Sequence, residues 1–355
     1  MNHRLLASSI VVVALLTVGT APAASQSRSA ANLTGVTSAL RAPDGKPSLQ
    51  GNWDFRTITP LERPASQANQ PVLSEAEAAA IQKEAESRKA RLAAPSEVRS
   101  QPRAPGGGGV AVGAYNDFWL DFGTNVVGDR RTSLIVDPPD GRLPPLTAGA
   151  KRQVGSLVED LALQRPIRVL DAGTRADGPE DRGLAERCIV GFNAGPPMMP
   201  SAYNNHLLLV QNSDYVVILN EMVHDARVIP LDGRPHLPSS IRQWMGDSRG
   251  HWEGDTLVVK TTNFSDKTAS FNPNGMMALG TGSTLNLTER FRRADQNTLI
   301  YEFTVEDPTT FTRPFTAALP MRRSDELVYE YACHEGNYGL FSILRGTRAE
   351  DQAAK

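Results

Sequence analysis

Residues 203–264 have the sequence YNNHLLLVQNSDYVVILNEMVHDARVIPLDGRPHLPSSIRQWMGDSRGHWEGDTLVVKTTNF. It holds four of the six histidines, and polar residues interrupt its short apolar runs. Short apolar runs bounded by turn residues are typical of β-strands. We therefore expect strands at 206–211, 215–222, 226–231, 241–245 and 256–264.

The C-terminal part of the chain continues the same pattern. Further strands are expected at 285–292, 299–306, 316–321, 327–333 and 338–344, with short turns such as 294–297 and 323–325 between them. Short turns make sequential strands antiparallel, and closing such a run removes its exposed edges. The prediction is a mainly β fold: an antiparallel up-and-down barrel, or a strongly curved sheet, with two accessory helices.

Three of these strands alternate with a period of two, which places each apolar set on one side of a sheet. The sets are Leu285, Leu287, Glu289 and Phe291; Leu299, Tyr301, Phe303 and Val305; and Leu327, Tyr329, Tyr331 and Cys333. Glu289, Tyr301 and Tyr329 then belong to an otherwise apolar interior. This interior is either a small-molecule pocket with those residues as ligand contacts or a filled core.

The N-terminus carries a targeting signal. A short basic start, an apolar run over 5–18 and small residues over 21–25 predict a signal peptide at 1–25. The apolar run is shorter than the roughly 20 residues of a spanning helix. We expect a secreted or periplasmic protein with no membrane span.

The mature chain is predicted to be one domain. A disordered leader (26–48) precedes a single β-rich domain (49–347), and a tail (348–355) follows. Within the domain, a surface helix is expected at 74–94, since Ser74 and Glu77 form a capping-box pattern. A flexible Gly-rich loop is expected at 102–109 and a second helix at 147–164.

The two cysteines, Cys188 and Cys333, predict one disulfide in an oxidising compartment. The long loop it would close corresponds to ~4 kcal/mol of stabilisation. The alternative is two separate buried thiols.

Several functional classes are excluded by pattern. The net charge is −2 without a basic stripe, so no nucleic-acid partner is expected. There is no G-x-S-x-G elbow and no G-x-G-x-x-G between a strand and a helix, which argues against an α/β-hydrolase and against nicotinamide or flavin chemistry. The expected partner is a small molecule, and the oligomeric state is open.

The densest polar cluster is Glu221, His224, Asp225 and Arg227. A turn at 223–225 would place His224 and Asp225 at a barrel rim, where a histidine beside carboxylates suits general-base catalysis. The alternative is a solvated hairpin with a surface ion pair.

A second cluster, Tyr331, His334 and Glu335, flanks Cys333. A histidine and a carboxylate fixed at a pocket mouth suit acid–base chemistry, and the alternative is ordinary turn polarity. The two clusters meet only if both strand ends lie on one rim.

No cofactor is predicted, and no metal ligands are assigned. Histidines 206, 224, 236, 251 and 334 are sufficient in number for zinc but lack a recognised ligand spacing, so a metal site is only a minor alternative. Trp244 and Trp252 flank a bend expected at 246–250, where they would pack together or stack on a sugar ring as ligand contacts.

Two resemblances add to this reading. Gly51-Asn52-Trp53 and Asp214-Tyr215 resemble the G-x-W and D-Y of lipocalins, which implies a ligand-holding barrel of calycin type. The stretches 244–259 (WMGDSRGHWEGDTLVV) and 330–338 (EYACHEGNY) are similar to signatures of a widespread family of secreted bacterial proteins without an assigned reaction. That resemblance implies secretion and a shared fold.

Together these features predict a secreted barrel that binds a small apolar or aromatic molecule and transforms it by His/carboxylate acid–base chemistry. A non-enzymatic carrier of lipocalin type and a metal-dependent or carbohydrate-acting hydrolase are the alternatives.

Overall fold

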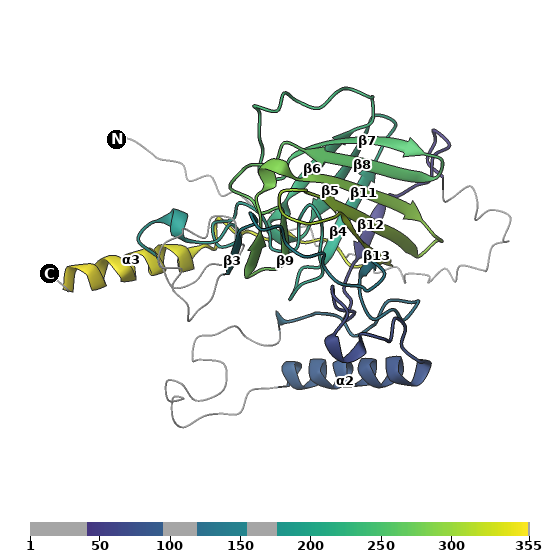
Figure 1. Ribbon diagram of the computed structural model, residues 1–355, viewed down its shortest axis with the longest axis horizontal. Coiled ribbons are helices and arrows are strands. Elements are labelled where there is room, and N and C mark those ends of the chain that lie inside the picture. The colour runs from purple at the N-terminus through teal and green to yellow at the C-terminus, as the bar shows by residue number, and fades with distance from the viewer. Residues whose placement is uncertain (1–40, 95–118, 155–175, 354–355) are drawn as a thin grey trace, which may run out of the picture. The chain divides into compact units, whose positions relative to one another are not determined.

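The computed structural model describes residues 41–94, 119–154 and 176–353 (Figure 1). The expected signal peptide and the Gly-rich loop at 102–109 lie outside these residues, as does the expected leader up to residue 40. Residues 41–48, the end of that leader, include a bridge between Arg41 and Pro47.

A ten-stranded antiparallel sheet dominates the described chain, in the order β6-β5-β4-β1-β13-β12-β11-β8-β7, with β2 paired to β13. The strands are β1 (Gly51–Asp54), β2 (Ile135–Asp137), β4 (His206–Gln211), β5 (Tyr215–Asn220), β6 (Ala226–Pro230), β7 (Asp247–Glu253), β8 (Thr256–Thr262), β11 (Asn286–Arg293), β12 (Thr298–Glu306) and β13 (Phe315–Ser324). A separate three-stranded sheet joins β3 (Arg152–Val154), β10 (Met277–Leu279) and β9 (Phe271–Asn274).

The two edge strands of the large sheet, β6 and β7, follow each other in the chain. Strands that follow each other in the chain are therefore neighbours through much of the sheet, with β1 inserted between β13 and β4. No ladder joins β6 to β7 in the described residues. Side chains nevertheless meet there: a Cβ added to Gly250 of β7 would lie 3.0 Å from Ile229 of β6. We call this unpaired contact between β6 and β7 the seam.

The predicted alternation is confirmed in β11 and β12. Leu299, Tyr301, Phe303 and Val305 are all buried, as are Leu287, Glu289 and Phe291. Apolar side chains from most strands fill the same interior. Of the two interpretations of these sets, the filled core is the one observed for β11 and β12.

Three strand predictions are wrong. Residues 241–245 form a turn with one isolated bridge, and 327–333 are irregular, so Leu327 and Tyr329 are exposed. Residues 338–344 belong to a helix, α3 (Tyr338–Ala353), which also takes in residues 348–353 of the expected tail. The α3 sequence continues with Ala, Glu and Arg, which favour helix, and this outweighs its short apolar start.

The other helix, α2 (Glu75–Ala93), confirms the surface helix. Ser74 accepts from the Glu77 amide, and the Glu77 carboxylate accepts from the Ser74 amide, as in a capping box. Only Ala78 of this helix is buried. The second predicted helix, 147–164, is wrong where it is described, because residues 152–154 form β3 through pairing with β10.

The sequence also hides strand β7. Residues 246–250 were expected to be a bend, but only Gly246 turns (φ 69°) and Asp247 begins a strand paired with β8. Short 3-10 turns occur at η1 (Ala65–Gln67), η3 (Pro179–Asp181), η4 (Met222–His224) and η5 (Gly282–Thr284). No helix among the described residues is long and apolar enough to cross a membrane.

Candidate functional site

A cavity of about 660 Å³ lies beside the only two cysteines. We call it the disulfide cavity; it is lined by Trp119, Ala185, Glu186, Tyr203, Asn204, Glu330, Tyr331, Ala332, Cys333, Gly336 and Asn337. Most of the stretch 330–338 singled out in the sequence therefore forms one wall. Aromatic rings and a few polar groups around a concave space are the usual composition of a small-molecule site.

The predicted disulfide is confirmed and anchors that wall. Cys188 is bonded to Cys333, with the two Cα atoms 5.8 Å apart. Cys188 packs with Met222 and Val223 in a small apolar cluster that Tyr203 and Tyr331 also contact. The bridge thus ties the irregular segment after β13 to the loop around Cys188, which packs against the β5–β6 turn.

Aromatic rings stand side by side in this region. The Tyr203 and Tyr331 rings are nearly parallel, with centroids 6.5 Å apart, and Phe192 meets Tyr203 edge-on at 5.1 Å. Phe192 supports Tyr203 from behind the cavity lining. The arrangement fixes the orientation of two of the three aromatic rings that line the cavity.

Backbone strain gathers around the same place. Six described residues other than glycine have positive φ, and four of them are Cys188, Asn204, Val223 and His224. Asn204 lines the cavity, Cys188 holds its wall, and the other two form the turn packed against Cys188. A buried valine with φ of 59° is a costly conformation, and strain of this kind concentrates at functional sites.

His224 of the first polar cluster contacts the backbone of Tyr331 in the second, a meeting that the sequence left open. Its Nδ1 lies 2.9 Å from the carbonyl oxygen of Tyr331. A carbonyl only accepts, so this contact assigns the proton of the neutral ring to Nδ1 and leaves Nε2 as the basic nitrogen. His334 and Glu335, by contrast, are exposed in the turn after Cys333.

Asp225, the next residue, contacts the loop that follows Cys188. Its carboxylate accepts the Gly191 amide at 2.9 Å. Burial raises the pKa of Asp225 to about 6, against smaller opposite effects of that hydrogen bond, His224 and Arg227. Its carboxyl therefore exchanges protons near neutral pH.

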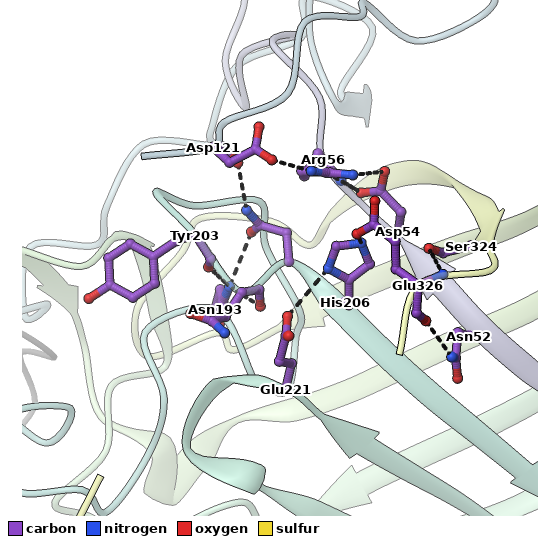
Figure 2. Close-up of polar contacts among 12 residues, drawn as sticks. Asn52, Asp54, Arg56, Asp121, Asn193, Tyr203, His206, Glu221, Ser324 and Glu326 are labelled. Atoms are coloured by element: carbon purple, nitrogen blue, oxygen red, sulfur yellow. Dashed lines mark hydrogen bonds and ion pairs between the residues drawn. The ribbon is translucent and has the colours of Figure 1, made fainter. Parts of the chain in front are cut away.

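Glu221 leaves this cluster and pairs with His206 at the start of β4. Its carboxylate lies 3.3 Å from His206 Nδ1, and Glu326 lies 3.3 Å from Nε2 on the other side. Figure 2 shows His206 between these two carboxylates, with the Tyr203 ring pointing away from it. Glu221 and His206 therefore form a separate unit next to the cavity.

A polar network extends from His206 along β1. Asp54, the cross-strand partner of His206, binds Arg56, which also pairs with Asp121. The Asp121 backbone oxygen accepts a hydrogen bond from the Asn205 side chain, which also makes two hydrogen bonds to the backbone of Ser201.

Asn193 supports the backbone of residues 203–204. Its amide nitrogen lies 3.0 Å from the carbonyl oxygens of both Tyr203 and Asn204. Asn193 and Asn205 are both buried, so the backbone that carries two cavity residues is held by fully enclosed amides.

Arg227 is in the core, away from the His224–Asp225 turn. It donates to both carboxylate oxygens of Glu289, at 2.6 and 2.9 Å, and the Tyr301 hydroxyl donates to the same carboxylate at 2.8 Å. Glu289 and Arg227 therefore form a buried ion pair. Burial raises the pKa of Tyr301 well above its ordinary value. These residues stabilise the interior and do not line the disulfide cavity.

The remaining predicted ligand contacts lie apart from one another. Tyr329 is 68% exposed, outside the cavity lining. Trp244 lies at the seam, whereas Trp252 is on β7 below Lys46, whose Nζ is 6.0 Å from its ring. The two tryptophans are therefore separate features of the molecule.

Histidines also do not gather into a metal centre within the described ranges, where no group of three or more His, Cys, Asp or Glu is placed to hold a metal ion. His236 instead contacts Asp247 at 2.9 Å, and His251 contacts Glu253 at 3.1 Å.

Sequence reasoning did not single out the lining residues outside 330–338 as site residues. Trp119, Glu186, Tyr203 and Asn204 come from segments outside the strands and α-helices. Only the aromatic residues could have been flagged, as rings placed in polar loop sequence. Comparison with protein-family models, curated proteins and solved structures finds no match for the chain.

Proposed function

We propose that the protein binds a small molecule with a flat ring, neutral or positively charged, in the disulfide cavity. The observation that carries the proposal is the cavity itself, about 660 Å³ and walled by Trp119, Tyr203 and Tyr331. Sites for small molecules commonly measure ≈ 300–1,000 Å³ and combine aromatic walls with few polar groups.

The charge of the lining supports the choice of ligand. It contains Glu186 and Glu330 and no Lys, Arg or His. Arg182 already pairs with Glu186, at 2.6 Å, which leaves Glu330 as the exposed carboxylate. Aromatic faces attract cations, and a nearby carboxylate adds to this attraction, so an anionic ligand is disfavoured.

We also propose that the protein functions outside the cytosol. A disulfide persists in an oxidising compartment, and the N-terminal sequence is that of a signal peptide. A carrier of lipocalin type, with the ligand held at the mouth of a curved sheet, fits the same features. The protein would differ from such a carrier because apolar side chains fill the interior that β11 and β12 face.

Acid–base turnover of the bound molecule is the second candidate. It is favoured by His224, whose Nδ1 is fixed on the Tyr331 carbonyl, and by Asp225, whose pKa is near 6. Catalysis predicts that His224→Ala abolishes turnover and retains binding, whereas a carrier is unaffected by the change.

A calorimetric titration tests the binding proposal with three probes of one size: benzyltrimethylammonium, benzyl alcohol and benzoate. Binding at the disulfide cavity is read as the part that Tyr331→Ala lowers, and we expect its affinity to fall in that order, with roughly tenfold between cation and anion. Tightest binding of benzoate at this Tyr331-dependent site, or no Tyr331-dependent binding of any of the three probes, would contradict the proposal.

A further inference from the structure

A second cavity, of about 560 Å³, lies at the seam and shares no lining residue with the disulfide cavity. We call it the seam cavity. Residues 226–228 of β6 form one side, the turn 242–246 and residues 247–249 of β7 form the other, and Ile189 closes it. The stretch 244–249, within the WMGDSRG signature, thus lines a cavity of its own.

Positive charge predominates in the seam cavity. Its lining holds three guanidinium groups, Arg227, Arg242 and Arg249, and one carboxylate, Asp247. Arg249 lies 2.6 Å from Asp247, so that pair is neutral. Arg242 bonds instead to the carbonyl oxygens of Phe264 and Ser283, both at 3.0 Å, and it forms no ion pair within the described part of the chain.

Asp247 is engaged by groups other than Arg242. Its second oxygen accepts from the Leu237 amide at 3.0 Å and contacts His236 Nδ1 at 2.9 Å. The local carboxylate is therefore already committed to the turn that shapes the cavity.

Arg227 is committed to the core and not to a ligand in the cavity. It is 4% exposed, and both of its terminal nitrogens are engaged by Glu289. Its Nε is buried and has no acceptor among the described residues. A buried N–H without a partner is unfavourable, but this nitrogen is enclosed, so Arg227 belongs to the cavity wall and adds no accessible donor.

We propose that the seam cavity binds a small oxyanion, a carboxylate or phosphate group, with the guanidinium of Arg242 as its recognition group. Guanidinium donors match the planar spacing of such oxygens. The flat ring of Trp244 in the lining adds a surface for an organic remainder attached to that group. This site is independent of the function proposed for the disulfide cavity.

The test changes the charge of the cavity wall without removing an existing contact. Ala226 is exposed and lines the seam cavity, so Ala226→Glu adds a carboxylate there, and Ala226→Gln is its neutral match in size. Full-length mature protein is titrated by calorimetry with inorganic phosphate and, separately, with benzoate. Phosphate binding alone indicates free phosphate; tighter benzoate binding indicates an organic carboxylate.

We expect Ala226→Glu to weaken binding of the preferred probe by roughly tenfold or more, and Ala226→Gln to bind as the wild type does. Arg242→Gln should weaken it by a similar factor, whereas Arg313→Gln, which alters a half-exposed arginine paired with Asp137, should not. No binding of either probe, or equal affinity of Ala226→Glu and Ala226→Gln, would overturn the proposal.

Discussion

At the residue scale, Asp225 shows how position changes a side chain's chemistry. Its pKa is raised from 3.8 to about 6 because burial disfavours the charged carboxylate. The folded protein therefore holds this proton more tightly than the unfolded chain. The free energy of unfolding consequently falls as pH rises from about 4 to about 6, and the penalty is fully present above that range.

Asp225→Asn removes the titrating group and keeps an oxygen for the Gly191 amide. We expect it to raise the free energy of unfolding at pH 7.5 by about 1–2 kcal/mol, less than the full shift because the side chain is partly exposed. At pH 4 the two proteins should be nearly equal. Urea denaturation at both pH values checks this, and destabilisation of similar size at both would contradict it.

Asp232→Asn is the matched control. Its partner Arg234 lowers the pKa of the exposed Asp232 carboxyl, so its stability contribution is present at neutral pH and lost in acid. The control should therefore change stability with pH in the opposite direction to Asp225→Asn.

The buried ion pair makes a second prediction at this scale. Arg227→Met leaves Glu289, which is 0% exposed, without its counter-charge, and breaking a buried pair costs ~3–5 kcal/mol. The double variant Arg227→Met/Glu289→Met should recover most of that loss. Denaturant titrations of the single and double variants decide it; a double variant less stable than Arg227→Met would refute the expectation.

At the element scale, the turn before β7 depends on Gly246. Its φ is 69°, and a Cβ there would lie 2.7 Å from the Thr262 backbone oxygen. Gly254, in the β7–β8 turn, has φ of 59° but open space around it. The two glycines thus separate backbone conformation from steric contact.

We expect Gly254→Ala to cost ~1 kcal/mol, from its left-handed backbone alone. Gly246→Ala adds a clash with backbone that cannot move freely, and should cost ~3 kcal/mol or more. Thermal and chemical unfolding of both variants measures the difference. Equal losses of unfolding free energy in the two variants would mean that packing does not constrain the turn at Gly246.

Period-two patterns explain which elements could be predicted from the sequence. Strands such as His206–Gln211 and Thr298–Glu306 match because one face is buried in a filled core. The pattern failed at 327–333, where the Cys188–Cys333 bridge and His224 hold an irregular segment. It also failed at Asp247–Glu253, a polar strand recognisable only through its pairing with β8.

The candidate site was predictable only in part, for a related reason. The 330–338 stretch could be predicted because its residues are contiguous in the sequence. The disulfide could be predicted because the chain has only two cysteines. Trp119, Tyr203 and Glu186 come together through tertiary packing of loops, and no local period encodes that. Arg227 and Glu289 are far apart in the chain, so their pairing was equally hidden.

At the scale of the whole molecule, the disulfide joins residues 145 positions apart. Cys188→Ser/Cys333→Ser should lower the free energy of unfolding by ~4 kcal/mol, because the unfolded chain regains the freedom of a long loop. It should also loosen the cavity wall and weaken ring binding. Reduction of the wild type and unfolding of the variant measure the first effect; an unchanged midpoint would contradict it.

Binding of a ring in the disulfide cavity can be tested by comparing two tyrosines of the same segment. Tyr331 lines the cavity, whereas Tyr329, two residues away, is exposed outside its lining. Calorimetric titration of benzyltrimethylammonium into Tyr331→Ala should show affinity reduced roughly tenfold, while Tyr329→Ala binds as the wild type. Equal binding by both variants, or loss in Tyr329→Ala alone, would contradict the claim.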